Sequence, residues 1–213
     1  DGVPASDLVA RFGTPLYVYS ARTLREHVRR LEAAFAEVEP LLCYAVKANG
    51  CDAVLREILG AGRRVGMDVV SVGELERAYL AGTPMDRIVF AGVGKGESEI
   101  RAALRGDCSA LRGWVGVDAN TLTSRGSVRC LNVESEQELE LIARVAGELG
   151  VCATAALRVN PDVDAFTHAY TTTGKADNKF GVAIQRAVDL FERFGRRSRT
   201  AHVLRLTGLH VHL

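Results

Sequence analysis

The sequence predicts an α/β fold with parallel strands. Strand-like and helix-like segments alternate along the whole chain. The 213 residues are 47% hydrophobic, which is enough to bury a sizeable core. No G-x-G-x-x-G motif follows the first strand-like segment, so the fingerprint of a dinucleotide-binding sheet is missing. An eight-stranded β/α barrel is therefore the first candidate, and an open doubly wound sheet is the alternative.

The amino-terminal segments predict a lead-in strand, a helix and the first barrel strand. Residues 14–20, TPLYVYS, are typical of a strand. Residues 21–37 predict a helix, because their apolar residues recur at helical spacing: Leu24, Val28, Leu31 and Phe35. Residues 41–48, LLCYAVKA, form an apolar run that predicts a buried strand and contains one lysine, Lys47. Residues 52–61 predict a short helix.

The next two units repeat this order of strand and helix. Residues 66–71, GMDVVS, predict a strand. Ser71 is followed three residues later by Glu74, a capping-box pattern that predicts the start of a helix. Residues 87–92, RIVFAG, predict the third barrel strand, and residues 98–105 predict the helix after it.

The carboxyl-terminal segments add three strands and two helices. Residues 128–135 predict a strand, and residues 135–149 predict a helix with one apolar stripe: Leu139, Ile142, Val145 and Leu149. Residues 153–160 predict a strand, residues 183–194 a helix, and residues 204–213 the last strand.

The spacing of these segments predicts an incomplete barrel. After the lead-in of residues 1–20, six strands fall in residues 21–213, whereas a complete barrel has eight strands and about 250 residues. Residues 106–127 interrupt the rhythm, because a helix-to-strand connection usually takes about 2 to 6 residues. A surface insertion, a sequence artefact and a functional loop are the three interpretations of this segment. It lies on the helix-to-strand side, away from the chemistry of a barrel.

Composition excludes several classes of function. Lys and Arg number 27 against 26 Asp and Glu, so nothing indicates nucleic-acid binding or an anionic membrane surface. No apolar run approaches the roughly 18 residues of a membrane-spanning helix, and no signal-peptide core is present at the start. The five cysteines are scattered without C-x-x-C spacing, which favours reduced thiols in the cytoplasm and no metal site.

Polar residues end most of the predicted barrel strands. They are Lys47, Asp68, Ser71, Glu134, Arg158, Asn160, His210 and His212. Because the carboxyl ends of barrel strands converge on one face, these residues predict a site for a polar, anionic small molecule. The glycine-rich residues 91–96 lack the full spacing of a phosphate-binding P-loop.

Five blocks of sequence stand out along the chain: YAVKAN, GMDVVSVGELERAYLAG, NVESEQEL, LRVNPDVDAFTHAYTTTGKADNKFGV and GLHVHL. Together they resemble the barrel domain of the diaminopimelate decarboxylase family, which belongs to the alanine-racemase-like group of pyridoxal-phosphate (PLP) enzymes. They occur in the family's order, and the fourth distinguishes the family from ornithine and arginine decarboxylases better than the first. The resemblance implies a barrel that binds PLP, followed in the family by a β domain that this chain lacks.

The resemblance also implies roles for four residues. Lys47 would bind the cofactor aldehyde covalently, and we expect partial burial to lower its pKa so that the neutral amine can attack. Asp68 would help to orient the site, and His212 would lie against the cofactor ring unless it is a core histidine. Arg158 would lie near the cofactor oxygens, or would simply pair with Glu134.

Other polar residues keep structural interpretations beside the functional ones. Glu74 either contributes to the site or accepts hydrogen bonds in its capping box. Lys179 is expected to form a structural ion pair. The loop at residues 162–174 is expected to shape the site, without a catalytic role for His168 or Thr172.

The function implied is PLP-dependent decarboxylation of meso-2,6-diaminopimelate to L-lysine and CO2, by a homodimer with shared active sites. The alternatives are a related ornithine- or arginine-type decarboxylase, a non-catalytic PLP-binding relative, and an interaction fragment. Six strands leave two open sheet edges, so we expect this chain alone to aggregate and to lack decarboxylase activity. Val72 stands where the family usually has glycine, and it is expected to crowd that turn.

Overall fold

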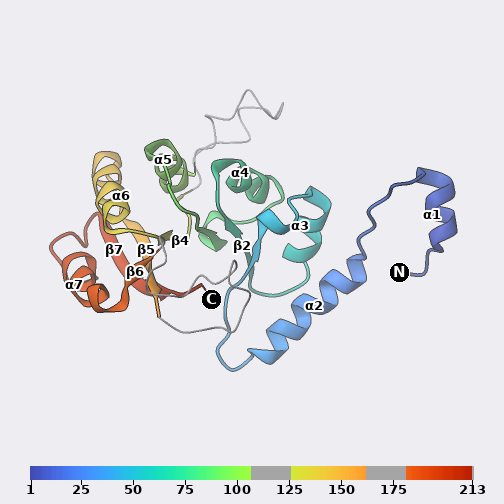
Figure 1. Ribbon diagram of the computed structural model, residues 1–213, viewed down its shortest axis with the longest axis horizontal. Helices are drawn as coiled ribbons and strands as arrows, with labels where there is room; N and C mark the ends of the chain where they lie inside the picture. The colour runs from blue at the N-terminus through green and yellow to red at the C-terminus, as the bar shows by residue number, and fades with distance from the viewer. Residues whose placement is uncertain (107–125, 162–180, 213) are drawn as a thin grey trace.

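The computed structural model describes residues 1–106, 126–161 and 181–212, in which most of the helices lie along one side of a sheet of parallel strands (Figure 1). The strands are β1 (Leu42–Ala45), β2 (Val65–Val69), β3 (Ile88–Phe90), β4 (Cys130–Val133), β5 (Ala153–Asn160), β6 (Val182–Ala183) and β7 (Leu204–His210). The α-helices are α1 (Ala5–Phe12), α2 (Ala21–Ala34), α3 (Asp52–Leu59), α4 (Val72–Leu80), α5 (Glu97–Arg105), α6 (Glu136–Leu149) and α7 (Ile184–Phe194). Two 3-10 helices are η1 (Val46–Ala48) and η2 (Met85–Arg87).

The order of the strands is that of a β/α barrel. Each strand from β1 to β5 pairs in parallel with the next one, and β7 also pairs in parallel with β5. A doubly wound sheet would reverse its strand order at a switch point, and this sheet does not. The predicted incomplete β/α barrel is therefore confirmed, with seven described strands instead of the six expected, and the doubly wound alternative is excluded. Within the described ranges β1 and β7 do not pair with each other, so this part of the barrel is open.

The apolar core lies between the strands and the surrounding helices. Side chains alternate along a strand, so one set faces the helices and the other faces the barrel interior. Met67 and Val69 of β2 and Phe90 of β3 are fully buried on the helix side. They pack with apolar residues of the helices that form an arc outside the strands (Figure 1): Leu75, Ile100, Leu139, Ile142 and Leu190. The interior side of the strands carries the smaller and polar residues that form the site.

Two helices begin with the same serine–glutamate arrangement. Ser71 Oγ accepts a hydrogen bond from the backbone N–H of Glu74, and Glu74 Oε2 accepts one from the N–H of Val70. Ser135 and Glu138 repeat both contacts at the start of α6, with the N–H of Glu134 as the second donor. The helix start and the serine cap predicted at Ser71 are thus confirmed. The glutamate differs from a capping box, because it accepts from the N–H of Val70, the residue before the cap, and so also holds the end of the preceding strand.

The strand predicted for residues 14–20 is wrong. These residues follow helix α1, which the sequence analysis missed, and run as an extended segment outside any sheet. Tyr17 is 86% exposed and Val18 is 61% exposed. Alternating apolar residues favour an extended backbone, but a strand also needs a neighbouring strand. None of the described residues supplies one here.

The remaining differences concern element ends. The first barrel strand stops at Ala45, and the backbone then turns into η1, which carries Lys47. The last strand stops at His210 instead of continuing to residue 213, and the two-residue strand β6 was not predicted. Of the interruption at residues 106–127, residues 107–125 lie outside the described residues.

Exposed ion pairs join the outer helices to one another. Arg144 of α6 bonds to Glu97 of α5 at 2.8 Å, and Arg101 of α5 pairs with Glu148 of α6. Arg193 of α7 bonds to Glu136 and Glu140 of α6 at 2.8 and 2.6 Å. Each side chain of these pairs is at least one quarter exposed, so we assign them little net stability, about 0 to 1 kcal/mol per pair.

Candidate active site

A pocket of about 550 Å³ opens on the interior side of the sheet, at the carboxyl ends of the strands. All four residues singled out from the sequence line it: Lys47, Asp68, Arg158 and His212. They come from η1, β2, β5 and the residues after β7. Because the carboxyl ends of barrel strands converge on one face, side chains as far apart in sequence as Lys47 and His212, 165 positions, meet in this pocket. Asn132, Glu134 and His210 also line the pocket.

Lys47 presents an accessible amine to this pocket. It is exposed, whereas the preceding residue, Val46, is 1% exposed and anchors η1 in the core. Lys47 is therefore more exposed than the partial burial that we expected. Lys95 is the other lysine that the structure describes, and its side chain is only 1% exposed. Of these two amines, only that of Lys47 is open to a ligand.

Asp68 lies on β2 beside Ala45 of β1 and faces the same pocket. Burial raises the pKa of this carboxyl, and the positive charge of Lys47 partly opposes the rise. Glu74 adds to the rise, and Lys95 opposes it as well. Lys47 and Asp68 line the same pocket, as a shared site requires.

Glu134 and Arg158 form a buried ion pair in the wall of the pocket. Arg158 Nη1 donates to Glu134 Oε2 at 2.8 Å, and each residue is 7% exposed. The ion pair that we kept as the structural interpretation of Arg158 is thus present. Arg158 lines the pocket as well, so the pairing holds its guanidinium group in place without removing it from the site.

The two histidines differ in their surroundings. His210 lies opposite Arg158 in the β5–β7 register, and its Nδ1 is buried without a hydrogen-bond partner among the described residues. Burial lowers the pKa of His210; Glu134 opposes this shift, while Arg158, His212 and Lys95 reinforce it. His212 follows the end of β7 and is exposed at the rim of the pocket.

His210 makes stability depend on pH. Because its folded-state pKa lies below that of the unfolded chain, the unfolded chain binds the proton more readily. We expect the free energy of unfolding to fall as the pH drops below about 6.5, the ordinary pKa of histidine. Urea denaturation of the protein and of His210→Gln between about pH 7 and pH 5 measures this, and the protein should lose more stability than the variant. Parallel pH profiles would contradict the prediction.

Other residues considered from the sequence fall outside the pocket or outside the described ranges. Glu74 accepts the hydrogen bond of the Val70 N–H, so the capping role is the one seen. The loop at residues 162–174 and Lys179 lie outside the described residues. Among the residues that the structure does describe, no group of three or more His, Cys, Asp and Glu side chains could hold a metal ion.

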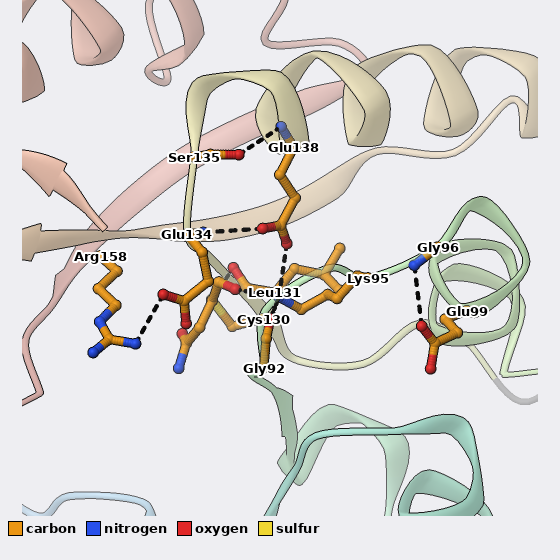
Figure 2. A network of polar contacts seen from close by, with 11 residues as sticks. Gly92, Lys95, Gly96, Glu99, Cys130, Leu131, Glu134, Ser135, Glu138 and Arg158 are labelled. Atoms are coloured by element: carbon orange, nitrogen blue, oxygen red, sulfur yellow. Dashed lines mark hydrogen bonds and ion pairs between the residues drawn. The ribbon is translucent and has the colours of Figure 1, made fainter. Parts of the chain in front are cut away.

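Lys95 is the feature that the sequence analysis missed (Figure 2). Its Nζ donates to the carbonyl oxygens of Gly92 and Asn132, both at 2.6 Å, and to Glu138 Oε1 at 2.7 Å. The sequence analysis considered the glycine-rich residues 91–96 only as an incomplete P-loop and gave Lys95 no role. A lysine two residues before a helix, with an apolar strand before it, was the only local signal.

The residues of the pocket fit a PLP cofactor at its aldehyde end. An open amine, a half-buried carboxyl and a buried guanidinium group are the donors and acceptors that a small polar anion with an aldehyde requires. The buried Nδ1 of His210 adds a polar atom that has no protein partner in the described residues. Lys47 would hold the cofactor covalently, with Asp68, Arg158 and His212 around it.

A family model for the pyridoxal binding domain of pyridoxal-dependent decarboxylases matches residues 21–213. The chain belongs to this family. The match confirms the cofactor expected from the sequence, because this family depends on pyridoxal phosphate. The match covers every strand of the barrel and begins at helix α2, so it leaves out the lead-in.

Among the similar curated proteins of the pyridoxal-dependent decarboxylases are diaminopimelate decarboxylases. The enzyme of Vibrio cholerae is 43% identical over 210 residues, which are 99% of this chain and 43% of that protein. The enzyme of Pseudomonas aeruginosa is 45% identical over 193 residues, which are 91% of this chain and 41% of that protein. The chain therefore spans less than half the length of these relatives.

Solved structures of the pyridoxal-dependent decarboxylases agree with this fold. Diaminopimelate decarboxylase of Helicobacter pylori, complexed with L-lysine, matches with a TM-score of 0.80 and 33% identity over 99% of this chain and 47% of that chain. A lysine/ornithine decarboxylase of Vibrio vulnificus matches with a TM-score of 0.67 at 20% identity, which shows the fold alone. In the described part of this chain, no helix has both the length and the apolar character needed to cross a bilayer.

Proposed function

We propose that this chain forms the cofactor-binding barrel of a diaminopimelate decarboxylase, which converts meso-2,6-diaminopimelate to L-lysine and CO2. The observation that carries the proposal is the meeting of Lys47, Asp68, Arg158 and His212 in one pocket. The names of the relatives at 43 and 45% identity support the choice of substrate. The cytoplasm as location and a homodimer with shared sites are further parts of the proposal.

Lys47 is the residue that we propose for covalent attachment of PLP. Its amine is open to the pocket, and the anchored η1 turn fixes where that amine can reach. When bound, PLP accepts the electron pair left on the α-carbon of the substrate as CO2 leaves. When it is not bound to the cofactor, Lys47 Nζ would be free to carry a proton to or from the substrate.

The surrounding residues orient the reactants. Asp68 supplies a carboxyl that lines the pocket and can accept a hydrogen bond there, and burial raises its pKa. Arg158 presents a positive charge to an anionic group, and Glu134 limits its movement. We propose that His212, at the rim, lies against the cofactor ring.

Substrate turnover by the full-length gene product tests this proposal. The purified protein, loaded with PLP, is supplied separately with meso-diaminopimelate, ornithine, arginine and lysine, and the release of CO2 is measured. We expect lysine to form from meso-diaminopimelate and the other amino acids to react far more slowly. Faster turnover of ornithine or arginine would contradict the substrate, and PLP binding without any CO2 release would indicate a non-catalytic relative.

A further inference from the structure

Lys95 is a buried cation that lies behind the wall of the pocket, in the connection between β3 and α5. Its three hydrogen bonds use all three protons of the ammonium group. Two of the acceptors, Gly92 and Asn132, line the pocket, while Lys95 does not. One side chain thus connects the loop after β3 to strand β4 directly behind the site.

Glu138 extends this connection to the ion pair in the wall (Figure 2). Its Oε1 binds Lys95, and its Oε2 accepts from the backbone N–H of Glu134 at 3.0 Å. The Glu134 carboxylate in turn binds Arg158 at 2.8 Å. A continuous series of contacts therefore leads from Lys95 through Glu138 and Glu134 to Arg158, and the last two of these residues line the pocket.

The equivalent turn of α4 shows that the cap itself needs no lysine. Glu74 makes the same backbone contact to Val70 as Glu138 makes to Glu134, and it forms no ion pair with a described residue. A buried ion pair also adds little net stability compared with apolar residues of the same size, because both charges must leave water. Holding the backbone in a particular geometry is therefore the better explanation for Lys95.

We propose that Lys95 is a positioning residue for the PLP site. It holds the Gly92 and Asn132 carbonyls and, through Glu138, the Glu134–Arg158 pair in the arrangement that binds the cofactor. The proposal rests on the PLP-binding part of the proposed function, and it is independent of which amino acid is decarboxylated.

The test separates positioning from stability by means of a double variant. Lys95→Met alone leaves Glu138 buried without its cation, whereas Lys95→Met with Glu138→Met removes both charges and retains apolar volume. For each protein the dissociation constant of PLP is measured by titration of its absorbance, and the stability of the cofactor-free protein by urea denaturation. Arg144→Met is the control, because Arg144 forms exposed ion pairs between α5 and α6.

We expect the double variant to regain most of the stability lost in Lys95→Met, yet to bind PLP about tenfold or more weakly than the unaltered protein. The control should leave both quantities nearly unchanged. Unaltered PLP affinity in the double variant would overturn the proposal and leave Lys95 a structural role only. If Lys95→Met does not fold, the double variant decides the question.

Failure here can be told apart from failure of the proposed function. An unaltered protein that binds PLP but forms no lysine refutes the proposed reaction, and the affinity comparison still tests Lys95. An unaltered protein that binds no PLP overturns both.

Discussion

Replacing Lys47 by alanine is expected to abolish covalent attachment of PLP and to lower lysine formation about a thousandfold or more, because the variant loses both the attaching amine and the proton carrier. Borohydride reduction of the PLP-loaded protein, followed by peptide mapping, measures the attachment. The pyridoxyl mass should fall on the peptide that contains Lys47. In Lys47→Ala no peptide should carry it.

Lys47→Arg is the matched control for charge. It keeps a cation in η1, but the guanidinium group stays protonated and does not attack an aldehyde at neutral pH. We expect it to resemble the alanine variant in the mapping experiment. A pyridoxyl group on any other lysine of the unaltered protein would show that the assignment of Lys47 is wrong.

Replacing Arg158 by methionine is expected to destabilise the protein by about 3 to 5 kcal/mol, because it leaves the Glu134 carboxylate buried without its cation. Both side chains are less than one tenth exposed, so solvent compensates little for the lost partner. Urea denaturation of the cofactor-free protein measures the change in the free energy of unfolding.

The double variant Arg158→Met with Glu134→Gln provides the control for this prediction. It removes both charges, and we expect it to recover much of the lost stability while still binding PLP weakly. A loss below about 1 kcal/mol in the single variant, as is typical of exposed pairs, would contradict the burial of this pair.

The sequence was sufficient to predict the β/α barrel and the residues that meet in the pocket at its carboxyl-terminal face. Strand 153–160 has the predicted bounds, and the polar strand ends at Lys47, Asp68 and Arg158 meet because parallel strands all end on one face. These features follow from local patterns and from a topology that repeats them.

The predictions that were wrong or missing concern features that depend on contacts between residues distant in sequence. Residues 14–20 have the pattern of a strand but no described strand beside them, and no local pattern can supply a partner. Lys95 sits in a glycine-rich stretch that the sequence analysis considered only as an incomplete P-loop, and its burial is stabilised by Glu138, 43 positions later. The exposure of Lys47 depends on the turn η1, which a continuous apolar strand does not predict.

The outer helices and the pocket wall use ion pairs that salt affects differently. Dissolved ions surround the exposed pairs joining α5, α6 and α7 and weaken them over a Debye length of about 8 Å at physiological ionic strength, whereas Lys95 and Glu138 are shielded from those ions by the protein itself. Raising the salt concentration therefore weakens the ion pairs between the outer helices more than the buried pair of Lys95 and Glu138. A salt titration can therefore separate the contribution of the exposed ion pairs between helices from that of the buried ion pair behind the site.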